Sequence, residues 1–127
     1  MSKKIFSIST IPGDGIGPTI IESATKIVDK ASSIVGGFEC KWDYIQAGAT
    51  YFKETGLDVE IGGEKKAAKS DAIFLGAIGL PNIRKQDGTE IAPHLRFREK
   101  FGLYAGVRPV KAYPNSPQRL KDKNSKN

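Results

Sequence analysis

The segment IPGDGIGP, residues 11–18, restricts the possible folds of this chain more than any other feature. It follows the apolar run 5–11, which is typical of a strand, and precedes an amphipathic helical pattern. Its three glycines permit a sharp turn with positive φ, and Pro18 suits a first helical turn because its missing N–H would have no partner there. The pattern predicts a strand, a tight loop and a helix start, whose free backbone N–H groups form a site for an anion or a cofactor.

The spacing of this first loop excludes two common nucleotide motifs. Pro18 stands where the dinucleotide fingerprint GxGxxG has its third glycine, and the lysine of a phosphate-binding loop is missing. A second strand-like run is followed by a glycine-containing loop in the segment FLGAIGLP, residues 74–81. Ligands of open α/β sheets bind beyond the carboxyl ends of the strands, so the two loops predict one cleft. Ordinary structural turns are the alternative for each loop taken by itself.

Strand-like and helix-like segments alternate along the chain, which predicts an α/β fold with a mostly parallel sheet and flanking helices. We expect strands over 4–11, 38–45 and 71–75, helices over 18–35, 47–54, 58–69 and 93–101, and an extended segment over 103–113. The expected core stripe of the first helix is Ile20, Ile21, Ala24, Ile27, Val28, Ala31 and Ile34. Residues 118–127 are polar and lysine-rich, so we expect a disordered tail after a structured portion, residues 1–117.

Arg98 and Arg108 are ten residues apart in the sequence. Arg98 lies in the last expected helix, and Arg108 lies in the extended segment that follows it. A helix that runs into a strand across such a gap can bring two guanidinium groups to one carboxylate, which each can grip with two hydrogen bonds. The pair therefore predicts an anionic substrate. Two solvated arginines are the alternative, because charged positions on a helix are usually exposed.

The motifs IPGDGIGP, GAIGLP and LRFREKFGLYAGVRP together resemble, in order and spacing, the N-terminal part of the β-decarboxylating dehydrogenases. These are the 3-isopropylmalate, isocitrate, homoisocitrate and tartrate/D-malate dehydrogenases. The resemblance runs from Lys4 to about Pro114, roughly the first third of a typical family member. It implies the N-terminal portion of the isocitrate/isopropylmalate dehydrogenase fold, which is not a Rossmann fold.

The resemblance assigns expected roles to residues of this chain. Arg98 and Arg108 match the arginines that hold the substrate carboxylate lost as carbon dioxide. The positions that match segments against the nicotinamide end of NAD are Ile16, Gly76, Ala77, Ile78 and Gly79. The resemblance thus implies an NAD-dependent oxidative decarboxylase of malate-like 2-hydroxy acids, in which Mg²⁺ or Mn²⁺ stabilises the enolate as a Lewis acid.

Specificity is expected to depend on His94 and Leu95, which match the residues that read the variable group of the substrate. Isocitrate enzymes tend to have serine and asparagine at the positions of Ala92 and His94, and isopropylmalate enzymes tend to have a leucine pair at His94 and Leu95. This chain matches neither pattern fully, and Gly106 replaces an asparagine frequent in the family. The resemblance implies an enzyme that is 3-isopropylmalate dehydrogenase-like or tartrate dehydrogenase-like. A cleft-edge histidine without chemistry is the alternative for His94.

The remaining machinery of the family lies beyond the matched region. This includes the third carboxylate-binding arginine, the catalytic tyrosine and lysine, the aspartate metal ligands and the loop that holds adenosine. We therefore expect no catalytic residue and no metal ligand within this chain, and no turnover by the chain alone. The alternative is a non-catalytic regulatory subunit, or an inactive fragment, of an isocitrate dehydrogenase-type assembly. The full-length family implies a homodimer.

Composition argues against two other classes of protein. The net charge of +6 attracts phosphate backbones, but the cations are spread along the chain without a recognised motif, so we expect no nucleic-acid partner. No apolar stretch approaches the ~20 residues needed to cross a bilayer, and the N-terminus lacks the apolar region of a secretory signal. We expect a cytoplasmic protein without membrane contact. Cys40, the single cysteine, is expected to be a small core-facing residue.

Overall fold

The computed structural model describes residues 3–109, so the tail predicted over 118–127 lies outside the described residues. The elements along the chain are β1 (Lys4–Ile11), α1 (Gly17–Val35), β2 (Phe38–Tyr44), α2 (Ala49–Thr55), α3 (Gly63–Lys69), β3 (Ala72–Leu75) and α4 (Pro93–Lys100).

The three described strands form one parallel sheet with β1 in the centre, in the order β2-β1-β3. In the register of the sheet, Ile8 lies opposite both Trp42 and Ala72, and Ile11 lies opposite Leu75. Because parallel strands need crossover connections, helices follow β1 and β2 in the chain. The predicted α/β class, a parallel sheet with flanking helices, is confirmed.

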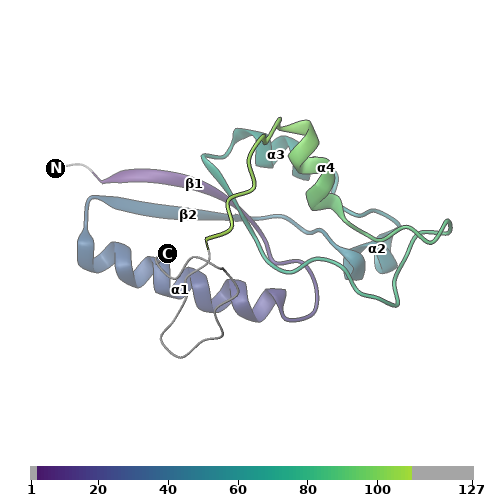
Figure 1. Cartoon of the computed structure of the whole chain (residues 1–127). Helices are drawn as coiled ribbons and strands as arrows, with labels where there is room; N and C mark the ends of the chain where they lie inside the picture. The colour runs from purple at the N-terminus through teal and green to yellow at the C-terminus, as the bar shows by residue number, and fades with distance from the viewer. Residues whose placement is uncertain (1–2, 110–127) are drawn as a thin grey trace, which may run out of the picture.

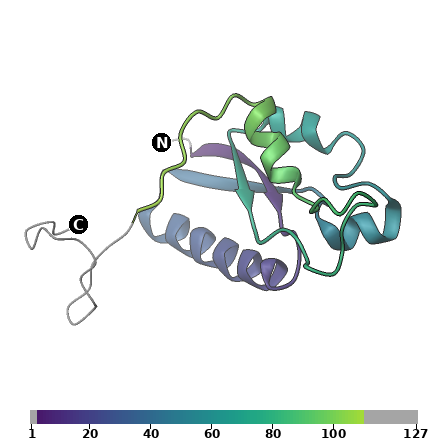
Figure 2. The same cartoon turned by 45° about the vertical axis from the view of Figure 1, so that its right-hand side comes forward.

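Helices cover both faces of the sheet (Figure 1). α1 runs along one face, and α3 and α4 lie on the other, as the turned view also shows (Figure 2). Two polar contacts fix α1 to β2. The Trp42 indole N–H donates to Asp29 at 3.0 Å, and the Ser32 hydroxyl donates to the Phe38 carbonyl at 2.5 Å.

The predicted core stripe of α1 is partly wrong. Ile21, Thr25 and Ser32 are buried, whereas Ile27 is 69% exposed. Ile20, Ala31 and Ile34 are exposed as well. The helix has one line of exposed isoleucines, Ile20, Ile27 and Ile34, and a buried line that contains Ile21, Thr25 and Ser32. Hydropathy alone favours the wrong line, because the line that packs on the sheet contains the more polar residues.

A buried apolar cluster lies between the sheet and the helices α3 and α4. Its buried members are Ile11, Ile45, Ala47, Val59, Ala67 and Phe97. Ile11 is the last residue of β1, so the cluster lies near the carboxyl end of the strand. The packing therefore supports the part of the molecule where the glycine loops leave the sheet.

Two predicted elements need correction. α3 begins at Gly63 rather than near residue 58, because Val59 forms an antiparallel bridge with Ala47 and Gly62 takes a left-handed φ of 81°. Residues 103–109 of the predicted extended segment form no strand, and its remaining residues lie outside the described part.

Cys40 is half-buried on β2, and burial raises the pKa of its thiol, with a smaller contribution from Asp29.

No helix within residues 3–109 is both long enough and apolar enough to span a membrane.

Candidate functional site

The two glycine loops lie against each other at the carboxyl ends of β1 and β3, as the sequence predicted. The Asp14 N–H donates to the Ala77 carbonyl at 2.6 Å, and the Gly76 N–H donates to the Ile11 carbonyl at 2.8 Å. A Cβ added at Gly13 would lie closer than 3.0 Å to the Ala77 backbone, and one added at Gly76 would meet Pro12 in the same way. Glycine is therefore required here for close approach of the two backbones.

Asp14 joins these loops to the start of α2. Its carboxylate accepts hydrogen bonds from the backbone N–H groups of Ala49 at 2.7 Å, Thr50 at 2.8 Å and Gly79 at 2.8 Å. The residue is only 2% exposed. The sequence analysis did not identify Asp14 as a site residue. The sequence held no signal for this role, because the hydrogen-bond partners of Asp14 lie 35 to 65 residues away along the chain.

The environment of Asp14 keeps its carboxylate ionised. Burial by itself raises the pKa of the carboxyl, but the hydrogen bonds from Thr50, Gly79 and Ala49 outweigh burial, and the pKa lies below its ordinary value of 3.8. None of the salt bridges within residues 3–109 involves Asp14. Backbone amides rather than a cation therefore stabilise this buried charge.

This pKa shift predicts how Asp14 contributes to stability at different pH. Because the pKa is lower in the folded chain than in the unfolded chain, the contribution is present above pH ~4 and is lost as the pH falls through the folded pKa. We expect the difference in unfolding free energy between the wild type and Asp14→Asn to be largest at neutral pH and to shrink below pH ~4. Urea titrations at several pH values measure this difference. A difference that stays constant down to pH ~3 would contradict an ionised Asp14.

The residues predicted to face the cofactor lie on these two loops. Ile16 is the N-cap of α1 and is 68% exposed. Gly79 has a left-handed φ of 103°, Ala77 is exposed and Ile78 is half-buried. The exposed Ile16 side chain and the backbone of the second loop are thus accessible to a bound molecule on the part of the surface where the loops meet.

A cavity of about 320 Å³ lies between the second loop and the N-terminus of α4. It is lined by Ile78, Gly79, Leu80, Pro81, Arg84, Glu90, Ile91, Ala92 and His94. The cavity therefore brings together two residues predicted for the cofactor with His94, which is predicted for the substrate. The buried Nδ1 atom of His94 has no hydrogen-bond partner within the described chain. A polar ligand group could supply this partner.

Arg98 and Arg108, the predicted arginine pair, follow the last cavity residue in the sequence. Neither of them lines the cavity. Arg98 is exposed on α4, and a Cβ added at Gly106 would lie 3.8 Å from a terminal nitrogen of its guanidinium group. The segment that carries Arg108 therefore passes next to Arg98. Neither arginine takes part in a salt bridge within residues 3–109. Convergence of both side chains on one carboxylate stays a prediction. Leu95 is 51% exposed on the same helix.

Arg96 fixes the position of α4. Its guanidinium donates two hydrogen bonds to Asp58, at 2.8 and 3.0 Å, and a third to Glu64 at 2.6 Å. Lys100 also pairs with Glu64. The hydrogen bonds to Asp58 raise the pKa of Arg96 above its ordinary value, and the hydrogen bond to Glu64 makes a smaller contribution. This cluster ties the helix that carries Arg98 to the start of α3.

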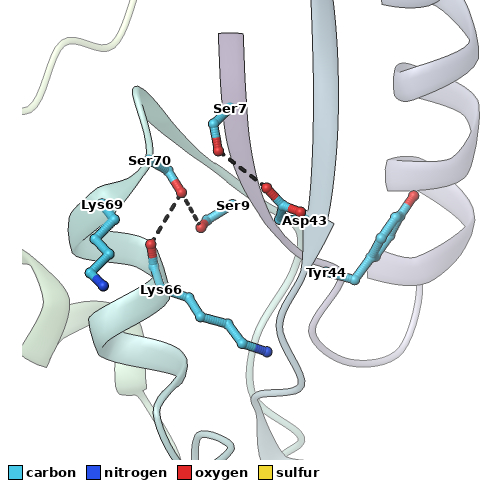
Figure 3. Close-up of a pocket in the computed structure, with 7 residues that line it drawn as sticks. All are labelled: Ser7, Ser9, Asp43, Tyr44, Lys66, Lys69 and Ser70. Atoms are coloured by element: carbon cyan, nitrogen blue, oxygen red, sulfur yellow. Dashed lines mark hydrogen bonds between the residues drawn. The ribbon is translucent and has the colours of Figure 1, made fainter.

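A second cavity, of about 330 Å³, opens on the face of the sheet beside α3 (Figure 3). The serine hydroxyls that line it already form hydrogen bonds within the protein. Ser9 and Ser70 share a hydrogen bond of 2.6 Å, and Ser7 donates to Asp43 at 3.1 Å. It contains none of the predicted site residues, so we assign the candidate site to the loop edge. Within residues 3–109, no group of three or more His, Cys, Asp or Glu side chains could hold a metal ion.

Comparison with known proteins identifies a matching family model and several relatives. Residues 7–127 match the model of the family described as isocitrate/isopropylmalate dehydrogenase. A "Probable tartrate dehydrogenase/decarboxylase" of Agrobacterium vitis is 32% identical over 117 residues, which is 92% of this chain and 32% of the relative. A 3-isopropylmalate dehydrogenase of Carboxydothermus hydrogenoformans is 36% identical over 112 residues, 86% of this chain and 30% of the relative.

A solved structure agrees with these matches. The apo crystal structure of a β-decarboxylating dehydrogenase from Thermococcus kodakarensis has a TM-score of 0.61 and 31% sequence identity, over 78% of this chain and 27% of that chain. The chain thus spans about a third of the length of the curated relatives it matches.

Proposed function

Since the chain belongs to the isocitrate/isopropylmalate dehydrogenase family, we propose that it is the N-terminal part of an NAD-dependent, metal-dependent oxidative decarboxylase of malate-like 2-hydroxy acids. Tartrate and 3-isopropylmalate are the substrates of the relatives by name. The full-length enzyme is proposed to be a homodimer. The observation that carries the proposal is the cavity between the second loop and α4, which combines Ile78 and Gly79 with His94.

The loop edge is suited to one end of a dinucleotide. Ile16 offers an exposed apolar surface, and the glycines of the second loop let a ligand approach the backbone closely. When bound, NAD would accept the hydride from the carbinol carbon of the substrate. The proposed contacts of its nicotinamide end are Ile16, Gly76, Ala77, Ile78 and Gly79.

The substrate is proposed to bind on α4 and the segment that follows it. Arg98 and Arg108 hold the carboxylate that leaves as carbon dioxide, since guanidinium groups bind a carboxylate with two parallel hydrogen bonds. His94 and Leu95 contact the variable group. The unpartnered Nδ1 of His94 favours a variable group that can form a hydrogen bond there. The metal has no set of ligands among residues 3–109, so we assign no step to it in this part of the chain.

We expect the 127-residue chain alone to show no turnover, because the residues expected to perform the chemistry lie in the part of the family fold that this chain does not match. The assay follows NADH formation from isopropylmalate, tartrate, D-malate and isocitrate, with a full-length tartrate dehydrogenase as positive control. NADH formation by the isolated chain would contradict this expectation.

A fusion tests the assignment directly. Residues 1–109 replace the matching part of a full-length relative, and the hybrid is assayed with the same four acids. Restored NADH formation supports the proposed function. A folded, dimeric hybrid that oxidises none of them would show that this segment does not perform the proposed role.

A further inference from the structure

We propose that Asp14 is a positioning residue that holds the two glycine loops and the start of α2 in one fixed arrangement, and that nicotinamide binding depends on this arrangement. The second half of this inference rests on the proposed function, because it requires the loops to face the cofactor.

The three partners of Asp14 come from two separate parts of the chain, both distant from Asp14 in sequence. Ala49 and Thr50 lie 35 and 36 residues beyond Asp14, and Gly79 lies 65 residues beyond it. One carboxylate therefore links the end of β1, the start of α2 and the loop after β3. No other side-chain hydrogen bond joins Gly79 to the rest of the described chain.

Asp14 also replaces the missing cap of α2. The N-cap residue is Gly48, which has no side chain to accept the first N–H groups of the helix. The carboxylate of Asp14 accepts two of them, and a Cβ at Gly48 would lie 2.5 Å from an Asp14 oxygen. The space left by Gly48 is thus filled by this carboxylate, and α2 cannot shift without breaking its hydrogen bonds to the residue that also holds the second loop.

Removing the carboxylate takes the partner from one buried N–H, that of Ala49, and from two part-buried ones, those of Thr50 and Gly79. The side chain has two oxygens and receives three N–H groups, and the backbone N–H of Asp14 donates to Ala77 in the second loop. Asparagine at this position would offer one oxygen, and its NH₂ group would face backbone N–H donors. The loops can then separate without loss of the sheet, because β1 and β3 remain paired through their own register.

The experiment compares Asp14→Asn with the wild-type chain by amide hydrogen exchange. We expect exchange of the Ala49, Thr50 and Gly79 amides to be about tenfold faster or more in the variant. The Ile45 amide, which donates to Thr10 in the sheet region, should keep its rate. Asp43→Asn is the matched control, since Asp43 accepts a hydroxyl of Ser7 at 3.1 Å and bonds to neither loop.

A second measurement tests the functional half. In the wild type, addition of NAD⁺ should shift the amide resonances of Ile16, Ala77 and Gly79, and Asp14→Asn should need about tenfold more NAD⁺ for the same shift. Asp43→Asn should behave as the wild type.

The possible results separate the two halves. Unchanged exchange at Gly79 in Asp14→Asn, or equal acceleration at Ile45, would overturn the positioning role. Local acceleration with unchanged NAD⁺ response would overturn the dependence of cofactor binding on Asp14. A third result is possible, in which NAD⁺ does not shift the wild-type resonances but local exchange is faster in Asp14→Asn as expected. The positioning role then stands, and the assignment of the loops to the cofactor fails.

Discussion

Gly13→Ala is expected to lower the free energy of unfolding of this chain by about 3 kcal/mol or more. A Cβ at this position would lie closer than 3.0 Å to the backbone of Ala77 and 2.9 Å from Ile78 Cγ1. The residue also has a left-handed φ of 75°, which costs an alanine about 1–2 kcal/mol. Backbone cannot move aside as a flexible side chain can, so the two loops would be forced apart.

Gly56→Ala is the matched control for this substitution. Gly56, the C-cap of α2, has a left-handed φ of 77°, close to that of Gly13, but no atom lies within 4 Å of its added Cβ. We expect it to lose about 1–2 kcal/mol, which measures the cost of φ alone. Urea unfolding followed by the fluorescence of Trp42, the single tryptophan, gives both values. Equal losses in the two variants would show that the added methyl group meets no backbone at Gly13, which would contradict the close approach of the two loops.

The glycine loops explain why much of the fold could be predicted from the sequence. Each loop follows a strand-like run, and glycine with positive φ marks the turn, so the local pattern and the tertiary contact agree. Boundaries were less predictable. The start of α3 depends on the bridge between Ala47 and Val59, a contact between residues that a local pattern does not relate.

The exposed isoleucines of α1 show a second limit of the sequence pattern. Ile20, Ile27 and Ile34 recur at seven-residue intervals and are exposed, while Thr25 and Ser32 pack on the sheet. Periodicity identifies an apolar face but not what covers it. Which face meets the described sheet is decided by the position of the strands.

In the site, the glycine loops could be predicted because their residues are adjacent in sequence, whereas Asp14 and Arg96 could not. The partners of Arg96, Asp58 and Glu64, lie 38 and 32 residues away. A charge pattern read along the chain treats such residues as solvated. Only the fold shows that Asp14 is buried and that Arg96 ties α4 to the start of α3.

In a dehydrogenase of full family length that carries this segment, Arg98→Ala and Arg108→Ala should each lower kcat/KM by about 10²–10⁴-fold, or about 3–5 kcal/mol. In the proposed function these guanidinium groups hold the carboxylate that leaves. Without one of them, a desolvated carboxylate loses two charge-assisted hydrogen bonds. Steady-state kinetics with the preferred acid measure the loss.

Two further variants separate binding geometry from charge. Arg98→Lys keeps the positive charge but not the planar guanidinium, so it should recover only part of the loss. Lys100→Ala removes a cation from the same helix, where Lys100 pairs with Glu64, and should change kcat/KM less than about threefold. If Arg98→Ala and Arg108→Ala behaved like Lys100→Ala, the arginines would be solvated surface residues. A large loss confined to the two arginines would instead place the substrate carboxylate beside Gly106, where the segment leading to Arg108 passes Arg98.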